Sequence, residues 1–391
     1  MGYAVARSLI AQGHSVACGG TGYSMLRGGQ SGVLGSFRYQ DPFAHTDTFL
    51  DSIALSIRKW SIDVLFPVHE ETFVVARHRE VFSDSIVLAP KFHDMLYAHD
   101  KWRSHRIAHA NGIDVPRTLA TSTKAELANA ISAIGLPVVV KPRFGSGANR
   151  VKVIRSLKDI DMLLLGISTK ELPHLLVQEY CSGEGVGLGA LLWEGTVQAF
   201  AGHKRLREIP ISGGTSTARV TFNHQQALGI LNTFARAMKF NGVAMFEFKF
   251  DSNRDKFYFL EINPRYYGGV GTAICSGVDF PTLHLETTIG TRRNSEQPLS
   301  TTSLVESRWL LGEIRALIQS LMKGHLRRAS TVLHIHPNHT INFDDFKLLN
   351  PSAFFYEMAS YVRNLVIHGS FGGATPEKDK FFADEYLQIP H

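Results

Sequence analysis

The sequence predicts a mixed fold that is α/β at its start and α+β through its middle. Residues 1 to about 90 alternate helix-like and strand-like segments, which is the pattern of an α/β domain with a parallel sheet. Residues 242–263 contain two segments rich in aromatic and branched side chains, joined by a polar turn, which indicates a β-hairpin or two neighbouring strands. At 391 residues the chain is longer than one hydrophobic core usually supports, so we expect roughly two or three domains.

Composition argues against several classes of protein. Hydrophobic residues make up 44% of the chain and charged residues 19%, as in an ordinary globular protein and unlike a disordered one. The net charge of +6 is modest and the basic residues are scattered, so no nucleic-acid partner is indicated. Cys18, Cys181 and Cys275 are odd in number and far apart, which favours a reducing compartment. With no signal peptide, and with apolar runs far below the ~20 residues that span a bilayer, we expect a cytoplasmic protein without a membrane partner.

The first domain has the expected elements of a small parallel sheet. A helix face at 5–10 precedes a strand at 15–18, and a helix at 71–82 separates strands at 61–68 and 85–89. We therefore expect three strands with helices between them.

The opening of this domain is unusual. The chain begins on what should be the first helix, with Gly2 where a glycine-rich turn normally follows an opening strand. Because a parallel strand is buried on both faces, the edge of the strand at 15–18 should be covered. We expect the cover to be the C-terminal extension or a second subunit, or a natural chain that starts upstream of Met1.

Residues 91–136 are expected to form a helical connector. One helix starts at Asp100-Lys101, and Thr123 with Glu126 makes a capping box for a second. Lys101 is a lone cation, which by itself indicates only a solvated helix charge.

A glycine-rich hairpin follows the connector. A strand at 137–141 ends in Lys141, a Gly-Ser-Gly turn follows at 145–147, and the chain returns as a strand at 151–154. Glycines let backbone N–H groups approach anionic oxygens, and Lys141 would add a charge beside them. Such a hairpin can fold over phosphates, although the pattern alone is more often only a turn.

Two further segments have polar residues where strands end. The strand at 175–180 leads into an irregular stretch whose backbone could bind the edge of an adenine ring, with Glu184 on ribose hydroxyls, unless it is an ordinary strand end. Residues 203–207 form a basic cluster beside a glycine–serine loop at 211–217. That cluster suits a carboxylate or a transferring phosphoryl group, and its alternative is a solvated hairpin.

Acidic residues stand within the strand pair of residues 242–263. Alternation puts Glu261 and Asn263 on one face with Phe259, and strand pairing would bring Glu247 opposite Glu261. Carboxylates that close repel each other unless a cation lies between them. Two carboxylates and one carboxamide suit Mg²⁺, which shares its coordination sphere with water and phosphates. The alternative is a pair of solvent-facing strand residues.

Beyond residue 290 apolar spacing predicts helices near 309–321 and 354–367, so the extension is ordered. His334, His336 and His339 could be metal ligands by type, but a Pro-Asn pair between them indicates a loop. We leave these histidines out of the site.

In this order the segments resemble the ATP-grasp superfamily, and within it the carboxylate–amine ligase-like branch. The resemblance covers roughly residues 1–290 and rests on Asp100-Lys101, Val140-Lys141-Pro142, Gly145-Ser146-Gly147, Gln178-Glu179-Tyr180, Gly183-Glu184-Gly185, Phe246-Glu247-Phe248-Lys249 and Leu260-Glu261-Ile262-Asn263-Pro264-Arg265. The resemblance to that branch rests on Gly183-Glu184-Gly185, on the cluster at 203–207 and on Ser212-Gly213-Gly214. The implied ATP-grasp fold has a Rossmann-like domain at 1–98 that lacks its first strand, two subdomains with ATP between them at 99–290, and a C-terminal extension of unknown role at 291–391.

The resemblance also implies a role for each residue of the site. ATP would be held by Lys101, Lys141, Gly145, Ser146, Gly147, Gln178, Glu179, Tyr180 and Glu184. Mg²⁺, or Mn²⁺ in its place, would be bound by Glu247, Glu261 and Asn263. The carboxylate substrate would be bound by His203, Arg205, Arg207, Ser212 and Gly213. Arg265 and Lys141 would be catalytic, because they stabilise the charge that develops during transfer.

The implied function is an ATP-dependent ligase that activates a carboxylate as an acylphosphate and couples it to an amine, releasing ADP and phosphate. Its partners would be small molecules, and a homo-oligomer is a possible assembly. The alternatives are a ligase with a thiol or bicarbonate-derived acceptor, or a nucleotide-binding regulatory protein without turnover. Neither substrate can be read from the sequence.

Overall fold

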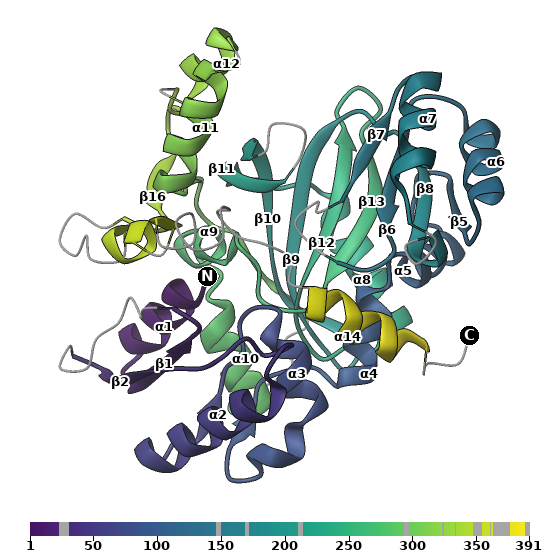
Figure 1. The fold of residues 1–391 in the computed structure, drawn as a ribbon. Helices are drawn as coiled ribbons and strands as arrows, with labels where there is room; N and C mark the ends of the chain where they lie inside the picture. The colour runs from purple at the N-terminus through teal and green to yellow at the C-terminus, as the bar shows by residue number, and fades with distance from the viewer. Residues whose placement is uncertain are drawn as a thin grey trace.

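The structure is a computed structural model of the 391-residue chain. Two sheets dominate it, a large mixed sheet at the centre and a smaller antiparallel sheet beside it, with the N-terminal helices and strands packed below them in Figure 1. The residues that the structure describes are 1–22, 31–145, 150–168, 172–209, 214–292, 297–322, 324–332, 334–346, 354–359, 361–362 and 376–387.

The N-terminal region forms two separate parallel strand pairs rather than one sheet. β1 (Val16–Gly20) pairs with β2 (Val33–Arg38), and β3 (Val64–Leu65) pairs with β4 (Ile86–Val87). The helices here are α1 (Gly2–Ala11), α2 (Thr46–Trp60), α3 (Glu71–Arg77) and the 3-10 turn η1 (Arg79–Phe82). The predicted parallel strands are confirmed, but the strand expected at 61–68 is reduced to β3.

The far edge of β1 has no strand on it in the described part of the chain. The strands described after residue 290 pair with the large sheet instead. For those residues, the expectation that the C-terminal extension covers β1 is therefore wrong. A second subunit and an upstream segment stay predictions.

The connector is helical, as predicted. It contains α4 (Phe92–His99), α5 (Lys101–Ala110) and α6 (Lys124–Ile134). Asp100 caps α5, because its Oδ1 accepts from the backbone N–H of Trp102 at 3.0 Å. Thr123 caps α6 by accepting from the N–H of Glu126 at 3.1 Å.

The smaller sheet has the strand order β5-β8-β6-β7 and is antiparallel throughout. Its strands are β5 (Thr118–Thr121), β6 (Val138–Pro142), β7 (Lys152–Ile154) and β8 (Leu175–Glu179), preceded by the 3-10 turn η2 (Leu172–His174). Helices α6 and α7 (Leu157–Gly166) pack on it, where Leu127, Ile131 and Leu163 meet the buried valines of β6 and β8. The predicted hairpin is confirmed in β6 and β7.

The large sheet has the order β13-β12-β9-β10-β11-β15-β16, with β14 beside β10. Its strands are β9 (Glu184–Trp193), β10 (Thr196–Ile209), β11 (Thr215–Thr221), β12 (Gly242–Asp251), β13 (Lys256–Asn263), β14 (Leu299–Ser300), β15 (Val305–Arg308) and β16 (Thr340–Phe343). Helix α8 (Gln226–Met238) covers one face, and its Phe234 ring lies 4.8 Å from Phe246 and 4.9 Å from Phe259. The antiparallel pairing of β12 with β13 confirms the predicted strand pair.

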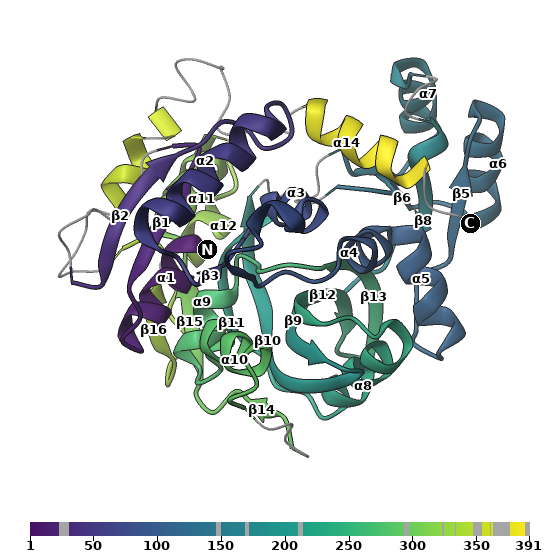
Figure 2. The same cartoon turned by 90° about the horizontal axis from the view of Figure 1, so that it is seen from below.

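Residues after 263 complete the large sheet and reach back across the molecule. The helices are α9 (Val270–Cys275), α10 (Phe280–Thr288), α11 (Leu310–Met322), α12 (Leu326–Thr331) and α14 (Pro376–Leu387), with a further helical stretch over 354–359 and 361–362. Helix α14 lies between α3 and the small sheet (Figure 2). There Phe382 packs edge-on against Phe73 at 4.9 Å, and the Tyr386 hydroxyl donates to the Leu96 carbonyl at 2.8 Å. The domain boundaries stay predictions.

None of the helices in the described ranges is long and apolar enough to cross a membrane. His334, His336 and His339 lie in a loop, as expected, with ring centroids 5.4 and 5.5 Å apart between neighbours. Glu306 accepts from the backbone N–H of His336 at 2.9 Å.

Candidate active site

The centre of the site is a pair of glutamates on neighbouring strands. Glu247 of β12 lies directly opposite Glu261 of β13 in the ladder, which confirms the predicted pairing. Their side chains are only 16% and 19% exposed. Two carboxylates in this position need nearby positive charge to stay ionised together.

A β-bulge turns Glu261 toward Glu247. The register shifts by one residue beside this pair: Glu247 opposes Glu261, but Phe248 opposes Phe259, so Leu260 is an extra residue of β13. Strict alternation put Glu261 on the face of Phe259, and that prediction is wrong. Phe259 lies in the hydrophobic core, whereas Glu261 points to the opposite face.

Two cations from different elements contact the two carboxylates. Arg205 of β10 places Nη2 2.5 Å from Oε2 of Glu247, and Lys101 of α5 places Nζ 3.2 Å from Oε2 of Glu261. Asn263 adds a hydrogen bond from Nδ2 to Oε1 of Glu247 at 3.0 Å. The structure thus brings three predicted metal ligands and two predicted anion-binding cations into one cluster.

The two carboxyl groups differ in their affinity for a proton. Burial raises the pKa of Glu247, an effect that Arg205 opposes and Glu261 reinforces. Burial acts in the same direction on Glu261, but Lys101 and Lys141 outweigh it and lower the pKa of Glu261. Glu261 is therefore the more firmly ionised member of the pair.

Lys141 reaches the same cluster from the end of β6. Its side chain is buried, and its Nζ donates to the Leu260 carbonyl at 3.4 Å. His105 Nε2 lies 3.0 Å from that carbonyl, which belongs to the bulge residue Leu260. Burial lowers the pKa of Lys141 to about 8, although Glu261 acts to raise it.

The start of the glycine-rich turn is anchored to the connector. Lys101 Nζ donates to the Gly145 carbonyl at 2.6 Å, and the Gly145 N–H donates to Nε2 of His99 at 3.2 Å. Burial, with Lys101 nearby, lowers the pKa of His99 to about 3, so this ring accepts as a neutral imidazole. Arg143 holds the Asp100 carboxylate through two hydrogen bonds of 2.8 and 2.5 Å.

Arg265 connects the end of β13 to the N-terminal region. Its Nη2 donates to Oε1 of Glu70 at 2.7 Å and to Oδ1 of Asn263 at 3.2 Å. Burial acts to raise the pKa of Glu70, but Arg265 and Lys378 of α14 hold it well below its usual range. Lys378 Nζ lies 3.6 Å from the same oxygen.

The strand expected to bind adenine, β8, is an inner strand of the smaller sheet. The backbone of Gln178 pairs with both β5 and β6, and its buried amide donates to Oγ1 of Thr118 at 2.8 Å. Glu179 ends the strand, and Tyr180, 38% exposed, begins an irregular segment. The nucleotide roles of these residues stay predictions.

The residues of the predicted basic cluster lie in different surroundings. Arg205 faces Glu247, as described above. Arg207 instead makes a buried two-pronged ion pair with Glu313 of α11, with Nε 2.8 Å from Oε2. His203 stacks on Tyr267 with its ring centroid 5.9 Å away, and burial holds its pKa well below the usual value. Only Arg205 of the three has a contact with the glutamate pair in the described structure.

One predicted residue lies at the margin of the site, and four others lie outside the residues that the structure describes. Glu184 begins β9 and pairs with Lys204 at 3.1 Å on the surface. The predicted residues Ser146, Gly147, Ser212 and Gly213 lie outside the described residues. Their roles stay predictions.

Sequence reasoning missed four residues around the cluster. These are Glu70, His99, Arg143 and Lys378. Each acts through a partner far away in the chain, 195 residues in the case of Glu70 and Arg265. The one local signal was Asp100, a helix cap directly before Lys101.

The donor set fits a magnesium ion. Within the described ranges no three or more His, Cys, Asp or Glu side chains form a group that could hold a metal by themselves. Two carboxylates and an amide, completed by water and phosphate oxygens, are the open arrangement that Mg²⁺ takes. A divalent cation between Glu247 and Glu261 would also relieve the repulsion between two largely buried carboxylates.

Comparison with known proteins identifies the fold. A family model described as ATP-grasp in the biosynthetic pathway with Ter operon matches residues 171–310. The biotin carboxylase domain of 2-oxoglutarate carboxylase from Hydrogenobacter thermophilus, in complex with MgADP and bicarbonate, superposes with a TM-score of 0.61 at 14% identity, over 77% of this chain and 70% of that one. The L-amino acid ligase from Bacillus licheniformis superposes with a TM-score of 0.55 at 14% identity, over 77% and 75%. The superpositions show that the chain has an ATP-grasp fold, and residues 171–310 are similar to an ATP-grasp family model.

One curated protein is similar in sequence, but it adds no information on function. An uncharacterized protein of Sinorhizobium fredii, y4rH, is 24% identical over 227 residues. The match covers 53% of this chain and 45% of that protein, so the chain spans about half the length of its relative.

Proposed function

We propose that this protein is an ATP-dependent ligase that activates a carboxylate as an acylphosphate and couples it to an amine. The observation that carries the proposal is the opposed pair Glu247 and Glu261, with Lys101, Arg205 and Lys141 around it. A carboxylate must approach a polyphosphate for this reaction, and such an approach requires concentrated positive charge. The cluster supplies that charge in a largely buried place.

The binding residues have separable tasks. Lys101 and Lys141 would hold ATP phosphates, and Lys101 also fixes the start of the glycine-rich turn through the Gly145 carbonyl. Glu247, Glu261 and Asn263 would hold Mg²⁺, which neutralises phosphate charge when bound. Because Lys101 is paired with Glu261 in the structure, nucleotide binding would exchange a carboxylate partner for phosphate oxygens.

The two arginines are suited to the acyl group. Arg265 is oriented by Glu70 and Asn263 beside the cluster, and Arg205 faces the cluster from β10. In the first step a carboxylate oxygen attacks the γ-phosphorus, and the bond to the ADP oxygen breaks. In the second step the amine attacks the acyl carbon and loses a proton to solvent, and phosphate leaves with the electrons of the C–O bond. Both steps develop negative charge on oxygens within reach of guanidinium groups.

A bicarbonate-derived acceptor is the second candidate, because a structural neighbour is described in complex with both MgADP and bicarbonate. A nucleotide-binding protein without turnover is the third. ADP formation with Mg²⁺ across pairs of amino acids and small acids distinguishes them. We expect ADP only when a carboxylate and an amine are both present, with a product mass equal to their sum less one water. ADP that requires bicarbonate instead, or nucleotide binding without ADP for any pair, would overturn the proposal.

A further inference from the structure

Helix α14 lies across the N-terminal region and the connector, next to the small sheet (Figure 2). Lys378, Phe382 and Tyr386 follow one another at intervals of four residues, so their side chains lie on one face of the helix. This face is turned into the molecule, because Phe382 and Tyr386 are buried. The Phe382 ring lies 4.8 Å from the ring of His99. Lys378 is therefore directed inward from the first turn of α14.

The other end of this face is held at two places. The Tyr386 ring stacks on Phe144, which directly precedes the glycine-rich turn, with centroids 3.6 Å apart and planes 8° from parallel. Glu385 forms an ion pair with Arg77 of α3 at 2.8 Å. Helix α14 is thus fixed against both the hairpin and α3, and these contacts determine where Lys378 lies.

Lys378 and Arg265 share one carboxylate oxygen. Arg265 Nη2 donates to Oε1 of Glu70 at 2.7 Å, and Lys378 Nζ lies 3.6 Å from the same oxygen. The side chains of Arg265, Lys378 and Glu70 are only 8%, 16% and 4% exposed. They come from the end of β13, from α14 and from the residue before α3. The packing of α14 on α3 is what brings the lysine to this group.

The charges of this group give the lysine a purpose. Glu70 with Arg265 alone is a neutral pair, and a neutral pair attracts an anionic group weakly. With Lys378 the group has one negative and two positive formal charges. Arg265 also contacts the amide of Asn263, a predicted metal ligand. The excess positive charge therefore lies beside the site, where negative oxygens of the acyl group and the phosphate would develop.

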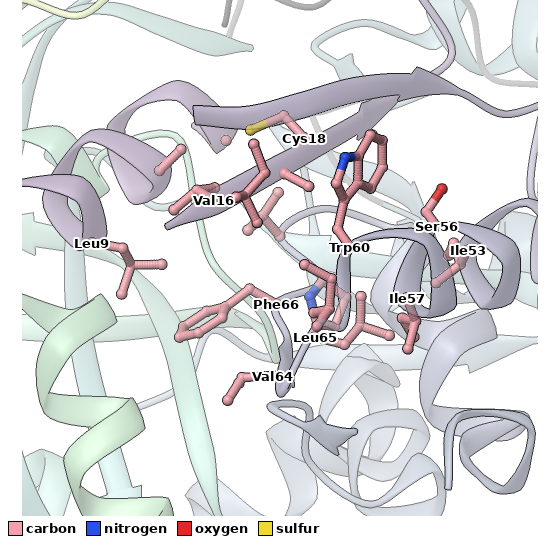
Figure 3. Close-up of a pocket in the computed structure, with 18 of the residues that line it drawn as sticks. Leu9, Val16, Cys18, Ile53, Ser56, Ile57, Trp60, Val64, Leu65 and Phe66 are labelled. Atoms are coloured by element: carbon pink, nitrogen blue, oxygen red, sulfur yellow. The ribbon is translucent and has the colours of Figure 1, made fainter. Parts of the chain in front are cut away.

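The segment that leads to Glu70 borders a cavity of about 690 Å³ (Figure 3). Phe66, Pro67 and Val68 line this cavity, and so does Glu71 at the start of α3. A chain beside a cavity lacks packing partners on that side, so fewer contacts hold it in place. The contacts of the Glu70 carboxylate with the two cations therefore contribute strongly to fixing its position.

We propose that Lys378 is a positioning residue for Arg265: from α14 it holds the Glu70 carboxylate in the place from which that carboxylate orients the guanidinium. This inference rests on the proposed ligase function, in which Arg265 stabilises charge on the acyl group. Lys378 acts through Glu70, the carboxylate with which it pairs in the described structure. Because a misplacement of about 1 Å can slow a reaction about a hundredfold, losing Lys378 should affect the chemical step more than nucleotide binding.

The kinetic test compares Lys378→Met with Lys380→Met, a matched control that removes an exposed lysine from the same helix. ADP formation is measured with a carboxylate and amine pair that the parent uses. We expect Lys378→Met to lower kcat at least about tenfold and to change the KM for ATP less than about threefold. Lys378→Arg should restore most of kcat because it returns the charge, and Lys380→Met should match the parent.

A double variant separates positioning from a general structural role. In an Arg265→Lys background, which removes the guanidinium that Lys378 is proposed to orient, Lys378→Met should cause no further loss of kcat. A lysine that only stabilised the fold would lower kcat in both backgrounds.

A second measurement needs no turnover. Side-chain NMR reads the rotation of the Arg265 guanidinium, whose signals are assigned by their loss in Arg265→Lys. We expect slow rotation with separate Nη signals in the parent and in Lys380→Met, and faster rotation with merged signals in Lys378→Met. If Lys378→Met does not fold, Lys378→Ala replaces it in both measurements, since alanine favours the helix.

An unchanged kcat, unchanged Nη signals, or a further loss of kcat in the Arg265→Lys background would each overturn the inference. Failure of the proposed function gives a different result, which is the absence of ADP from the parent with every substrate pair. The rotation of Arg265 then decides the inference alone: merged signals in Lys378→Met support it, and signals equal to those of the parent overturn it.

Discussion

Two arginines on β10 are two residues apart and enter opposite kinds of surroundings. Arg205 faces the carboxylates of Glu247 and Glu208, which are largely buried. Arg207 is enclosed by α11 and α12, where Glu313 binds it in two places and the Thr331 carbonyl accepts from Nη1 at 2.7 Å. Both guanidinium groups donate to protein atoms, but Arg205 contacts the predicted metal ligand Glu247, whereas Arg207 contacts only residues of α11 and α12 in the hydrogen bonds of the described structure.

The difference arises in the backbone of β10. Its register with β11 shifts between Arg205 and Arg207, and again before Glu208. A β-bulge of this kind changes where neighbouring side chains point. We therefore propose that Arg205 serves the site, whereas Arg207 stabilises the scaffold, although the two residues have the spacing of alternate strand positions.

The largest effect should come from breaking the scaffold pair. Arg207→Ala leaves the Glu313 carboxylate buried without its cation, so we expect a loss of about 3–5 kcal/mol in the free energy of unfolding in urea. The double variant Arg207→Met, Glu313→Leu removes both charges and should recover most of the loss. A single-variant loss below about 1 kcal/mol would contradict the scaffold role.

The next effect concerns the glutamate pair. Glu261→Gln should lower Mg²⁺-dependent ADP formation at least about a hundredfold and leave the fold intact, because a neutral amide cannot balance an ion shared with phosphates. Glu208→Gln, beside Arg205 but outside the strand pair, is the matched control. Turnover of Glu261→Gln within a few-fold of the parent would remove the metal assignment.

A smaller effect is expected at Arg205. Arg205→Ala should raise the KM of the carboxylate substrate roughly tenfold and change nucleotide affinity less, because the guanidinium faces the cluster from β10. Arg205→Lys keeps the charge but lacks the two-pronged geometry of a guanidinium. Its KM for the carboxylate should lie between those of the parent and Arg205→Ala. Equal losses for ATP and the carboxylate would contradict a role in acyl binding.

The smallest effect is in the pH dependence. The pKa of Lys141 is lowered to about 8 by burial, so its ammonium loses charge as pH rises through 8, and ATP affinity should fall a few-fold. In the window between 8 and the ordinary lysine value, the unfolded chain binds more protons than the folded one, and this residue's contribution to stability rises with pH. Titrations of ATP at pH 7 and 9 check this, and Lys141→Arg should abolish the fall. A parent affinity equal at both values would show that Lys141 does not contact the nucleotide.

Much of the site could be predicted because its signals are local. Strand composition and the polar turn were enough to pair Glu247 with Glu261, and Asp100 marked the helix that holds Lys101. The bulge at Leu260 could not be predicted, because β-bulges depend on pairing between strands and not on the alternation of one strand.

Contacts between residues far apart in the sequence could not be predicted either. The contact of Arg265 with Glu70 and that of Arg207 with Glu313 depend on how separate elements pack. The same holds for the fold. The predicted N-terminal strands correspond to β1, β3 and β4, but β2 was not predicted, and the division into two pairs depends on how the elements pack.

The central claim is that Glu247 and Glu261 form a magnesium-dependent nucleotide site, and calorimetric titration tests it most directly. ATP is titrated into the parent and into Glu247→Gln, each with and without Mg²⁺. We predict that Mg²⁺ strengthens ATP binding to the parent at least about tenfold and that this gain disappears in Glu247→Gln, with both proteins unfolding at the same temperature. The same gain from Mg²⁺ in both proteins would contradict the claim.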